Sequence, residues 1–455
     1  MKPVSEAAPR PATDQSTSDP AEPAGDSGWR NAVMSELSRR HFLRGAALTG
    51  GGFLATTLAA CAPATPTPRW TYGPIGVPEP AGSPTPAPAT PVPSAAASAT
   101  PAASAAIPPG FSASDVDARQ VVRRYLGNLV PALEGIFGAT TFGKLGEILA
   151  VADGYPELSQ KPAFMQVGQQ LTLTDLLAPL TPEIVDGVKV YRLTIEEVSL
   201  KIDELRPPVE ALGYNGQVPG PTIRANEGDR LRVIFTNKLK EATTVHFHGV
   251  EFDDFFQDGV PFVTQLPIVP GETYAYEFTV KSTGSLMYHS HHNATDQVGR
   301  GLLGAFIVEP KDNPIQYDRE YIWVSNDVLG GFTINGCGFP ATVPILAAVG
   351  ERVLVRFMNE GVMMHPFHSH GFVMNVVARD GRPLGSAAFE CDTLGVNPGE
   401  RWDAVITADR PGVWAFHCHI LPHVEGPSGM FGMVTTLIVV PEKAHVDAIV
   451  GALLA

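Results

Sequence analysis

The chain has 455 residues, which is enough for two or three domains of ordinary size. Its 45 Gly and 42 Pro favour a turn-rich β fold over a helical bundle. A formal net charge of −15 without runs of Lys or Arg argues against binding to nucleic acid or anionic lipid. No apolar stretch reaches the roughly 18 residues of a membrane span, and four Cys are too few to staple a fold. The 13 His are the informative residues, because all except His41 and His445 lie in four short clusters.

The first 110 residues have the composition of an export signal followed by a tether. Arg39 and Arg40 precede a short, weakly apolar run that ends in Leu-Ala-Ala-Cys at Cys61, which resembles a twin-arginine signal with a bacterial lipobox. We expect residues 1–61 to be this signal, and the mature protein to be exported and held at the cell membrane by a lipid anchor alone. Residues 62–110 contain 14 Pro and only two charged residues, so we expect a disordered linker.

The next segment has helical periodicity. Apolar residues recur at helical spacing from Val121 to Leu129 and again from Phe142 to Leu149. We therefore expect residues 111–164 to form a short helical extension that packs on the main body.

An internal duplication follows. The segment around Gly228 recurs 122 residues later around Gly350, and Pro270-Gly-Glu recurs 128 residues later at Pro398. Short runs of alternating β-branched and aromatic residues, bounded by Gly, Pro and Asn, lie between these landmarks and are typical of β-sandwiches. We expect an all-β fold of two tandem sandwich domains and a C-terminal helix, at residues 165–312, 313–441 and 442–455.

Four pairs of histidines are separated by a single residue. In a strand, residues i and i+2 point to one face, so each pair presents two imidazoles together. The pairs are His246/His248, His289/His291, His368/His370 and His417/His419. The third pair lies 122 residues after the first and the fourth 128 after the second, so each domain offers the same four imidazoles. Eight imidazoles with few carboxylates favour copper over calcium or magnesium, and suit a cluster of about three ions.

A different set of donors belongs to the second domain alone. Cys418 lies between two histidines of a pair, so its side chain points to the opposite face. With His365, His423 and Met430 it offers one thiolate, two imidazoles and a thioether, the set of a blue-copper electron-transfer site. The equivalent positions of the first domain hold Thr243, Ser290, Thr295 and Leu302. We therefore expect cluster ligands in both domains and a blue copper only in the second.

These clusters resemble the copper-binding signatures of multicopper oxidases, a family that includes laccases and ascorbate oxidase. The resemblance covers residues 165–441 and is to the two-domain kind, which implies two cupredoxin-like Greek-key β-sandwich domains. It implies about four copper ions per chain as cofactor, one of type 1, one of type 2 and two of type 3. The implied ligands are His365, Cys418, His423 and Met430 for type 1, His246 and His368 for type 2, and His248, His289, His291, His370, His417 and His419 for type 3. Met430 lies twelve residues after Cys418, two more than is common in the family, and Met433 is the other candidate.

The resemblance also implies a reaction and an assembly. A small reducing substrate, of phenol type or similar, would be oxidised one electron at a time at type 1 copper, and dioxygen would be reduced to water at the cluster. That reduction needs protons, and Asp296 and Glu425 are the candidate carboxylates, whereas Asp258 is interpreted as a turn residue. In two-domain relatives the cluster lies between domain 1 of one subunit and domain 2 of the next, which implies a homotrimer.

Three alternatives share parts of this pattern: a metal-ion oxidase acting on Cu(I), Fe(II) or Mn(II), a copper nitrite reductase, and a copper carrier or a structural relative without metals. Missing type 1 ligands in the first domain argue against the reductase, and complete ligand sets argue against metal loss. Spacing leaves open whether Cys337 and Cys391 form a disulfide.

Overall fold

The computed structural model describes residues 113–127, 129–138, 162–163, 180–203, 206–427 and 429–454. The expected signal, the expected linker and the periodic segment Phe142–Leu149 lie outside these residues. Two helices come first, α3 (Ala113–Leu126) and α4 (Leu129–Phe137). The periodicity from Val121 to Leu129 therefore spans the end of one helix and the start of the next. Among the described residues, no helix is long and apolar enough to cross a membrane.

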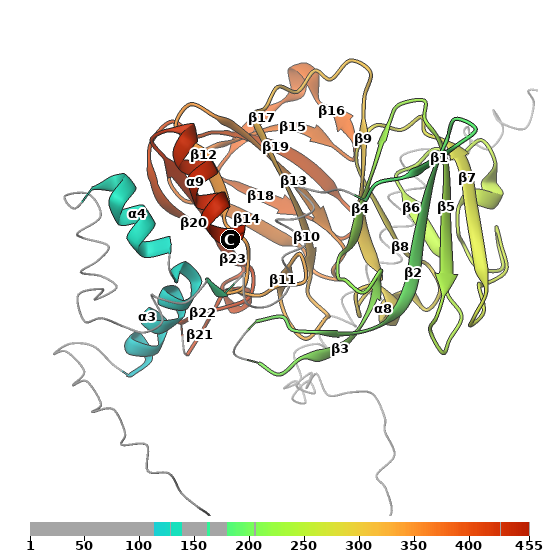
Figure 1. Cartoon of the computed structure of the whole chain (residues 1–455), viewed down its shortest axis with the longest axis horizontal. Coiled ribbons are helices and arrows are strands. Elements are labelled where there is room, and N and C mark those ends of the chain that lie inside the picture. The colour runs from blue at the N-terminus through green and yellow to red at the C-terminus, as the bar shows by residue number, and fades with distance from the viewer. Residues whose placement is uncertain are drawn as a thin grey trace, which may run out of the picture. The chain divides into compact units, whose positions relative to one another are not determined.

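Domain 1 consists of two packed sheets, drawn in green to yellow in Figure 1. One sheet contains β1 (Glu183–Val185), β2 (Val188–Leu200), β3 (Val209–Tyr214), β5 (Arg230–Asn237) and β7 (Thr273–Thr279). The other contains β4 (Gly220–Asn226), β9 (Leu303–Glu309), β8 (Gly284–Ser290) and β6 (Val245–His248), in that spatial order. Buried aromatic side chains, among them Phe235, Phe247 and Phe306, fill the space between the sheets. Two short helices interrupt the loops, η3 (Phe255–Gln257) and α8 (Ala294–Gln297).

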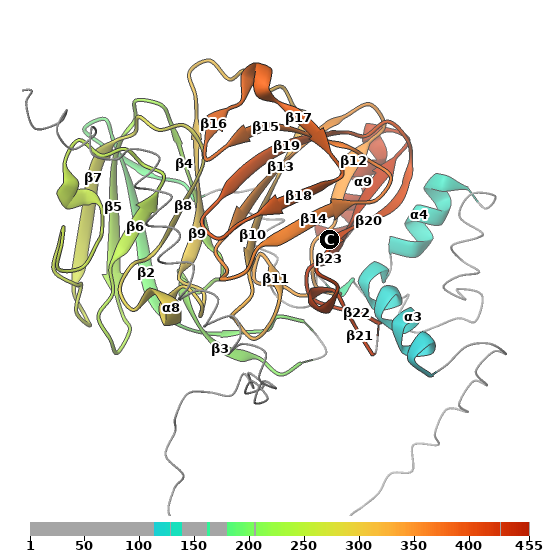
Figure 2. The ribbon, with the colours of Figure 1, turned by 180° about the vertical axis from the view of Figure 1, so that it is seen from behind.

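Domain 2 repeats the plan, in orange to red (Figures 1 and 2). Its larger sheet contains β11 (Thr333–Ile334), β10 (Arg319–Asn326), β13 (Arg352–Asn359), β19 (Arg401–Thr407), β15 (Met374–Arg379), β16 (Arg382–Pro383) and β17 (Phe389–Cys391). The facing sheet has the order β12 (Ile345–Ala348), β23 (Val434–Val440), β20 (Gly412–Cys418), β14 (His365–Ser369) and β18 (Thr393–Val396). Smaller elements are η4 (Gly385–Ala387), η5 (Leu421–His423) and the hairpin of β21 (Glu425–Gly426) and β22 (Gly429–Met430).

The duplication is visible in strand pairing as well as in sequence. β2 runs parallel to β5 in domain 1, and β10 runs parallel to β13 in domain 2. The repeated Gly228 and Gly350 precede β5 and β13 with φ angles of 90° and 93°, a region that L side chains rarely adopt. The repeated landmarks are therefore glycine-dependent turns that set up equivalent strands.

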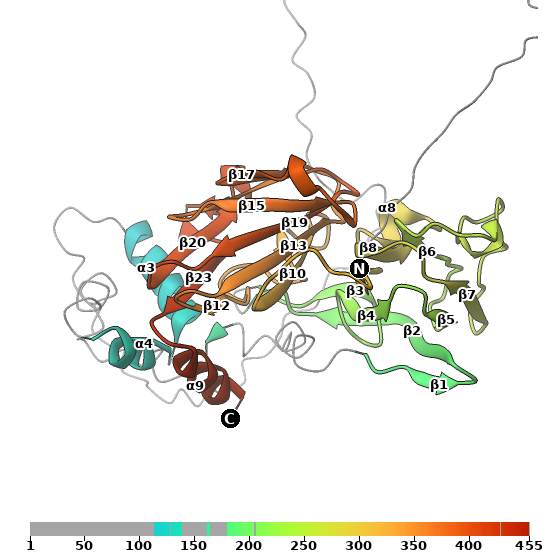
Figure 3. The same cartoon turned by 90° about the horizontal axis from the view of Figure 1, so that it is seen from above.

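The three longer helices, α3, α4 and α9, pack on domain 2. α3 lies beside β22, and the C-terminal helix α9 (Lys443–Leu454) lies beside β12 and α4 (Figure 3). The hydroxyl of Tyr125 in α3 lies 2.9 Å from Oγ1 of Thr436, and its ring lies 4.7 Å from that of Phe339. The extension is therefore part of the domain 2 core, as the shared burial of Tyr125 and Leu129 also indicates.

A buried polar group joins the two domains. Nη1 of Arg356 in β13 donates to Oδ2 of Asp403 at 3.0 Å and to Oγ of Ser285 in domain 1 at 3.0 Å. Glu320 accepts from the same guanidinium. Buried ion pairs of this kind contribute little net stability, but they fix the geometry of the groups that they join. Here they hold β8, which carries His289, against domain 2.

Candidate metal centre

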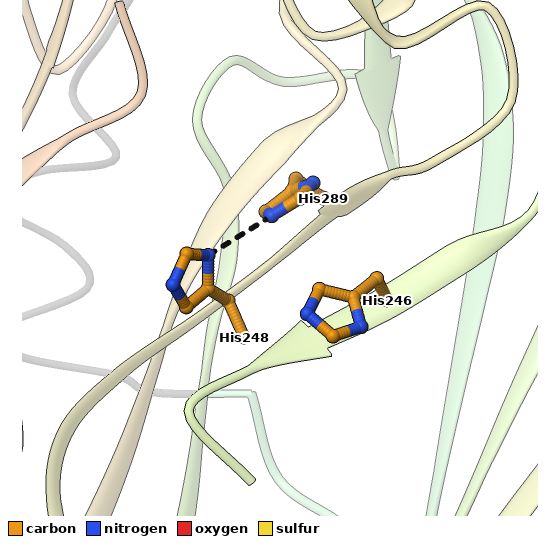
Figure 4. A group of neighbouring side chains, drawn as sticks. All are labelled: His246, His248 and His289. Carbon is orange, nitrogen blue, oxygen red and sulfur yellow. Dashed lines mark hydrogen bonds between the residues drawn. The ribbon is translucent and has the colours of Figure 1, made fainter. Parts of the chain in front are cut away.

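The four histidines of domain 1 gather at one end of the sheet that contains β6 and β8. Strand pairing sets His246 directly opposite His289. The ring centroid of His246 lies 5.3 to 5.7 Å from those of the other three histidines. Nδ1 of His248 lies 3.3 Å from Nε2 of His289, the dashed line in Figure 4. One nitrogen atom each of His246, His248 and His289 lies within 4.8 Å of the other two, which is close enough for the three residues to bind one metal ion.

Domain 2 repeats this arrangement in the same register. β14 pairs with β20 so that His368 lies directly opposite His417. The ring centroid of His368 lies 4.8 to 5.8 Å from those of the other three histidines of its cluster. Nε2 of His370 lies 2.9 Å from Nε2 of His417. In both domains the last histidine, His291 or His419, is exposed, so each cluster opens on the surface of the chain.

Backbone carbonyls orient four of these rings. Nδ1 of His246 donates to the carbonyl of Asp258 at 2.7 Å, and Nδ1 of His368 donates to that of Asp392 at 3.0 Å. The histidines opposite them donate to the carbonyl of the residue that follows each, at 2.9 Å. A carbonyl oxygen only accepts, so Nδ1 carries the hydrogen and Nε2 keeps the lone pair that binds a metal. Asp258 therefore does more than form a turn, because it orients a cluster histidine.

Burial favours the neutral form of several cluster imidazoles. It lowers the pKa of His248 to about 3 and that of His289 to about 4, and neighbouring positive charge adds to the effect. In domain 2, burial lowers the pKa of His370 and His417 in the same direction. Since only the neutral imidazole binds a metal ion, both clusters are competent for metal binding at neutral pH.

His365, Cys418 and His423 meet in the interior of domain 2. Sγ of Cys418 lies 3.8 Å from Nδ1 of His365 and 3.7 Å from Nδ1 of His423. All three side chains are buried, and their donor atoms lie within 4.8 Å of one another. One sulfur and two imidazole nitrogens in a closed pocket fit copper. Burial raises the pKa of the Cys418 thiol to about 11, so a bound cation is needed to ionise it at neutral pH.

The fourth expected donor is less simply placed. Met430 is 37% exposed, and its backbone pairs with Glu425 in the β21–β22 hairpin. Met433 is fully buried, and its carbonyl accepts from the N–H of Cys418 at 3.0 Å. In domain 1 the N–H of Ser290 donates to Leu302 in the same way. By this register Met433, rather than Met430, is the structural counterpart of Leu302. The sequence offset of 128 residues, which aligns Leu302 with Met430, does not apply here because the loop before β23 is longer in domain 2.

Two residues beside the thiolate site carry no signal in the sequence. Oδ2 of Asp327 lies 3.1 Å from Nε2 of His365, and the two carboxylate oxygens accept from the N–H groups of Val362 and Met363. Burial alone would raise the pKa of Asp327, but these hydrogen bonds outweigh burial and lower that pKa. The ring of Phe332 stacks on that of His423 with centroids 3.9 Å apart. Both residues lie far from the histidine motifs along the chain, so only the fold brings them to the site.

The candidate proton-donating carboxylates lie at the edge of these sites. Asp296 lies in α8, is about half exposed, and faces Arg300 at 3.5 Å. Glu425 is exposed and belongs to the β21–β22 hairpin. The carboxylate that does line the domain 1 histidine cavity is Glu360, which sequence analysis did not single out.

Two cysteines and two histidines of the described residues lie outside the candidate metal sites. Cys337 is buried and Cys391 is half-buried, and both are free thiols, so the disulfide left open by the sequence is not formed. His292 lies outside the domain 1 cluster, with its ring 6.5 Å from that of Phe262. His445 lies in α9, away from both clusters.

The fold and these donor sets define a two-domain β protein built to bind copper, and known proteins are similar to it. Family models described as multicopper oxidase match residues 195–313 and 316–442. An iron transport multicopper oxidase of Saccharomyces cerevisiae is 32% identical over 43% of this chain and 36% of its own length. Laccase-2 of Botryotinia fuckeliana is 29% identical over 56% of this chain and 50% of its own length. The crystal structure of a blue copper oxidase from Nitrosomonas europaea is 33% identical, with a TM-score of 0.52 over 55% of this chain and 85% of that chain.

The chain therefore belongs to the multicopper oxidase family, a family of oxidoreductases. It spans half or less of the length of the two curated relatives described above. The crystal structure from Nitrosomonas europaea is matched over most of its length.

Proposed function

We propose that this protein is a copper oxidase that couples one-electron oxidation of a small reductant, of phenol type or similar, to reduction of dioxygen to water. The observation that carries the proposal is the position of Cys418. Its sulfur lies against His365 and His423, while its two chain neighbours, His417 and His419, belong to the histidine cluster. The backbone of three residues thus connects an electron-transfer site to a site with several imidazoles.

The ligand assignment follows the two kinds of donor set. His365, Cys418 and His423 would hold type 1 copper, with Met430 as the axial ligand that the family resemblance implies. His246 and His368 would hold type 2 copper, and the other six cluster histidines would hold the type 3 pair. Bound copper would supply one-electron transfer at the first site and dioxygen reduction at the second, with about four ions per chain.

The residues of the chain prepare these sites before metal arrives. Hydrogen bonds from Nδ1 to backbone carbonyls aim Nε2 of His246 and His368 into their clusters. Asp327 holds His365 through Nε2, which leaves Nδ1 toward the sulfur of Cys418. Such fixed rings lose little freedom on binding and raise metal affinity.

We propose that the working assembly is a homotrimer, with each cluster formed between domain 1 of one subunit and domain 2 of the next. Each domain carries four cluster histidines, which is half of the expected set, and both groups open on the surface. Large apolar side chains are exposed near them. Phe262 and Leu266 in domain 1 are both 76% exposed, and Val362 and Val373 in domain 2 are 64% and 54% exposed. Apolar surface of this kind marks a contact with another protein, and a second copy supplies the missing histidines.

We further propose export by the twin-arginine route and a lipid anchor at Cys61, which rest on the sequence of residues 1–61. Asp296 and Glu425 also remain predictions for proton delivery.

A metal-ion oxidase is the second candidate function, favoured by the similarity to an iron transport multicopper oxidase. The copper sites serve both reactions equally, so the reducing substrate distinguishes them.

Elemental analysis of the copper-loaded full chain is the first test, followed by oxygen uptake with phenols and with Fe(II), Mn(II) or Cu(I). We expect about four copper ions per chain and oxygen uptake with a phenol-type reductant. His289→Ala should lose cluster copper and oxygen uptake, whereas His445→Ala, a histidine outside both sites, should keep them. About two ions per chain would instead favour a nitrite reductase, and uptake with metal ions alone would favour the metal-ion oxidase.

A further inference from the structure

The domain 1 histidine cluster borders a cavity of about 370 Å³. All four cluster histidines of domain 1 line it, and residues of domain 2 close its other side. Glu360 is the acidic residue in this lining, next to Asn359 at the end of β13. The cavity thus brings a carboxyl group of one domain to the imidazoles of the other.

The backbone fixes Glu360 in this position. Its N–H donates to the carbonyl of Ser325 at 3.0 Å, and its carbonyl accepts from the side-chain amide of Asn326. Its Oε1 atom is buried and has no hydrogen-bond partner among the described residues. A buried polar oxygen without a partner has lost its hydrogen bonds to water without replacement, so such atoms call for an explanation in function or in bound water.

The titratable neighbours of Glu360 come from both domains. Arg401 of β19 lies near enough to favour the ionised form, and Tyr214 of β3 interacts with the carboxyl electrostatically. Burial outweighs Arg401 and raises the pKa of Glu360 to about 8. The other titratable groups of the cavity are the four histidines, held neutral by burial or open to solvent at its mouth. In the copper-free chain the protonated carboxyl group is therefore favoured at neutral pH.

We propose that Glu360 is the acid that delivers protons to the domain 1 side of the cluster. The inference rests on the proposed function, since dioxygen is the species that takes up the protons. Reduction of one dioxygen to two waters consumes four electrons from the reductant and four protons. For each proton from Glu360 the carboxyl O–H bond breaks and an O–H bond of the product forms. The carboxylate is then reprotonated from bulk solvent, so that the four protons consumed in each cycle come from solvent.

The two carboxylates suggested by the sequence are less suited to this step. Asp296 is half exposed, and its carboxylate faces Arg300 at 3.5 Å on the surface of α8. Glu425 is exposed in the β21–β22 hairpin, in the loop that follows His423. A proton donor needs an O–H group at the pH of the reaction and a path to the reacting atoms. Glu360 is the better candidate, because its Oε1 atom is buried and the residue borders the histidine cavity.

The test compares Glu360→Gln with Glu210→Gln, a matched change at an exposed residue of β3. Both proteins are loaded with copper, and the blue type 1 band is followed by stopped flow. Anaerobic reduction by the substrate should be equal in the wild type and both variants. Reoxidation of the reduced protein by dioxygen should slow by about 100-fold or more in Glu360→Gln alone. The wild-type rate should fall as pH rises through the pKa of Glu360, and Glu360→Gln should lose this dependence.

A second readout needs no copper. The infrared spectrum of the copper-free wild type at neutral pH should contain a protonated carboxylic acid band that is absent from Glu360→Gln. Absence of that band, or wild-type reoxidation in Glu360→Gln, would overturn the proposal for Glu360 while leaving the oxidase function intact. A wild type that binds copper but takes up no dioxygen would overturn the proposed function and the inference with it. Glu360→Asp, which keeps the acid, should recover part of the reoxidation rate, and failure to do so would assign Glu360 a structural role.

Discussion

The same position in the two domains holds a set of candidate metal ligands in domain 2 and a hydrogen-bond network in domain 1. In domain 2, Cys418 ends β20 and its sulfur faces two imidazoles. In domain 1, Ser290 ends β8 at the equivalent position, and its hydroxyl donates to Oε1 of Gln297 at 2.6 Å. The hydroxyl of Thr243, which replaces His365, donates to the same oxygen at 2.8 Å. In domain 1, Thr243 and Ser290 thus share Gln297 of α8 as acceptor, whereas in domain 2 His365 and Cys418 face each other.

Strand register and side-chain chemistry are separable in this fold. β6 and β8 pair as β14 and β20 do, and both pairs align the cluster histidines. The side chains on the opposite face of the same strands differ completely. In domain 1 they satisfy one another, and the Gln297 amide also donates to the carbonyl of Ala242. In domain 2 the buried Cys418 thiol, whose pKa is raised by burial, instead faces the imidazoles of His365 and His423, a donor set that fits a metal cation.

The largest effect on activity is expected when Cys418 of domain 2 is replaced by serine, the residue type found at the equivalent position of domain 1. Cys418→Ser removes the thiolate while keeping the shape and the strand pairing of the site. We expect loss of the blue band and a fall in oxygen uptake of more than about 100-fold, because even outer partners of metal ligands cost up to that much. Elemental analysis should find about one copper ion fewer per chain. Retention of the blue band in Cys418→Ser would contradict the assignment of the type 1 site.

Removing the negative charge of Asp327 should have an intermediate effect. The ionised carboxylate lies beside His365 and favours the more positive, oxidised state of a bound copper. Asp327→Asn should therefore raise the reduction potential of type 1 copper and lower copper affinity about 10- to 100-fold. Redox titration of the blue band and competition with a chelator measure the two changes. Asp409→Asn, an exposed aspartate paired with Arg410, should leave both unchanged, and an unaltered potential in Asp327→Asn would refute the role.

The sequence predicted those features that depend on local periodicity. Pairs of histidines at i and i+2 imply one strand face, and the alternation with Cys418 implies the opposite face, as the structure has them. The repeated glycine turns predicted two equivalent sandwiches. Helical spacing did not predict that the extension breaks after Leu126 and resumes at Leu129, since apolar periodicity continues through the break.

Residues that act through distant contacts could not be found in this way. Asp327 reaches His365 from the end of a different strand, and Glu360 reaches the domain 1 cavity only because two domains pack together. Gln297 carries no motif either, since its role depends on Thr243 and Ser290. Loop length was the further obstacle, because three extra residues before β23 shift Met433 into the position that spacing gave to Met430.

The two methionines offer a sharper test of the domain 2 loop, with a smaller effect. Met430→Leu and Met433→Leu keep volume and remove the thioether, so each should cost less than about 1.5 kcal/mol of stability. We expect Met430→Leu to raise the potential of type 1 copper and change its absorption, because the axial ligand tunes both. Met433→Leu should leave them unchanged. The opposite outcome would assign the axial position to Met433, in agreement with its burial and its bond to the Cys418 N–H.

The smallest effect should come from the network of domain 1. Gln297→Ala leaves the buried hydroxyls of Thr243 and Ser290 without their acceptor, which should lower the free energy of unfolding by about 1–3 kcal/mol. Urea denaturation checks this, with Gln316→Ala at an exposed position as the control. The blue band should be unchanged, because no donor of the type 1 site lies in domain 1.

A further variant separates the two causes of the lower free energy of unfolding in Gln297→Ala, which are lost hydrogen bonds and lost packing. Thr243→Val combined with Ser290→Ala and Gln297→Leu removes all three polar groups together, so that no buried hydroxyl is left without a partner. Replacing both partners of a buried hydrogen bond by apolar groups is nearly neutral, and the Ala242 carbonyl loses its donor in both variants alike. The triple variant should therefore be more stable than Gln297→Ala. If it is equally unstable, the fit of Gln297 rather than its hydrogen bonds holds α8 in place, and the contrast with domain 2 is one of shape rather than of polar satisfaction.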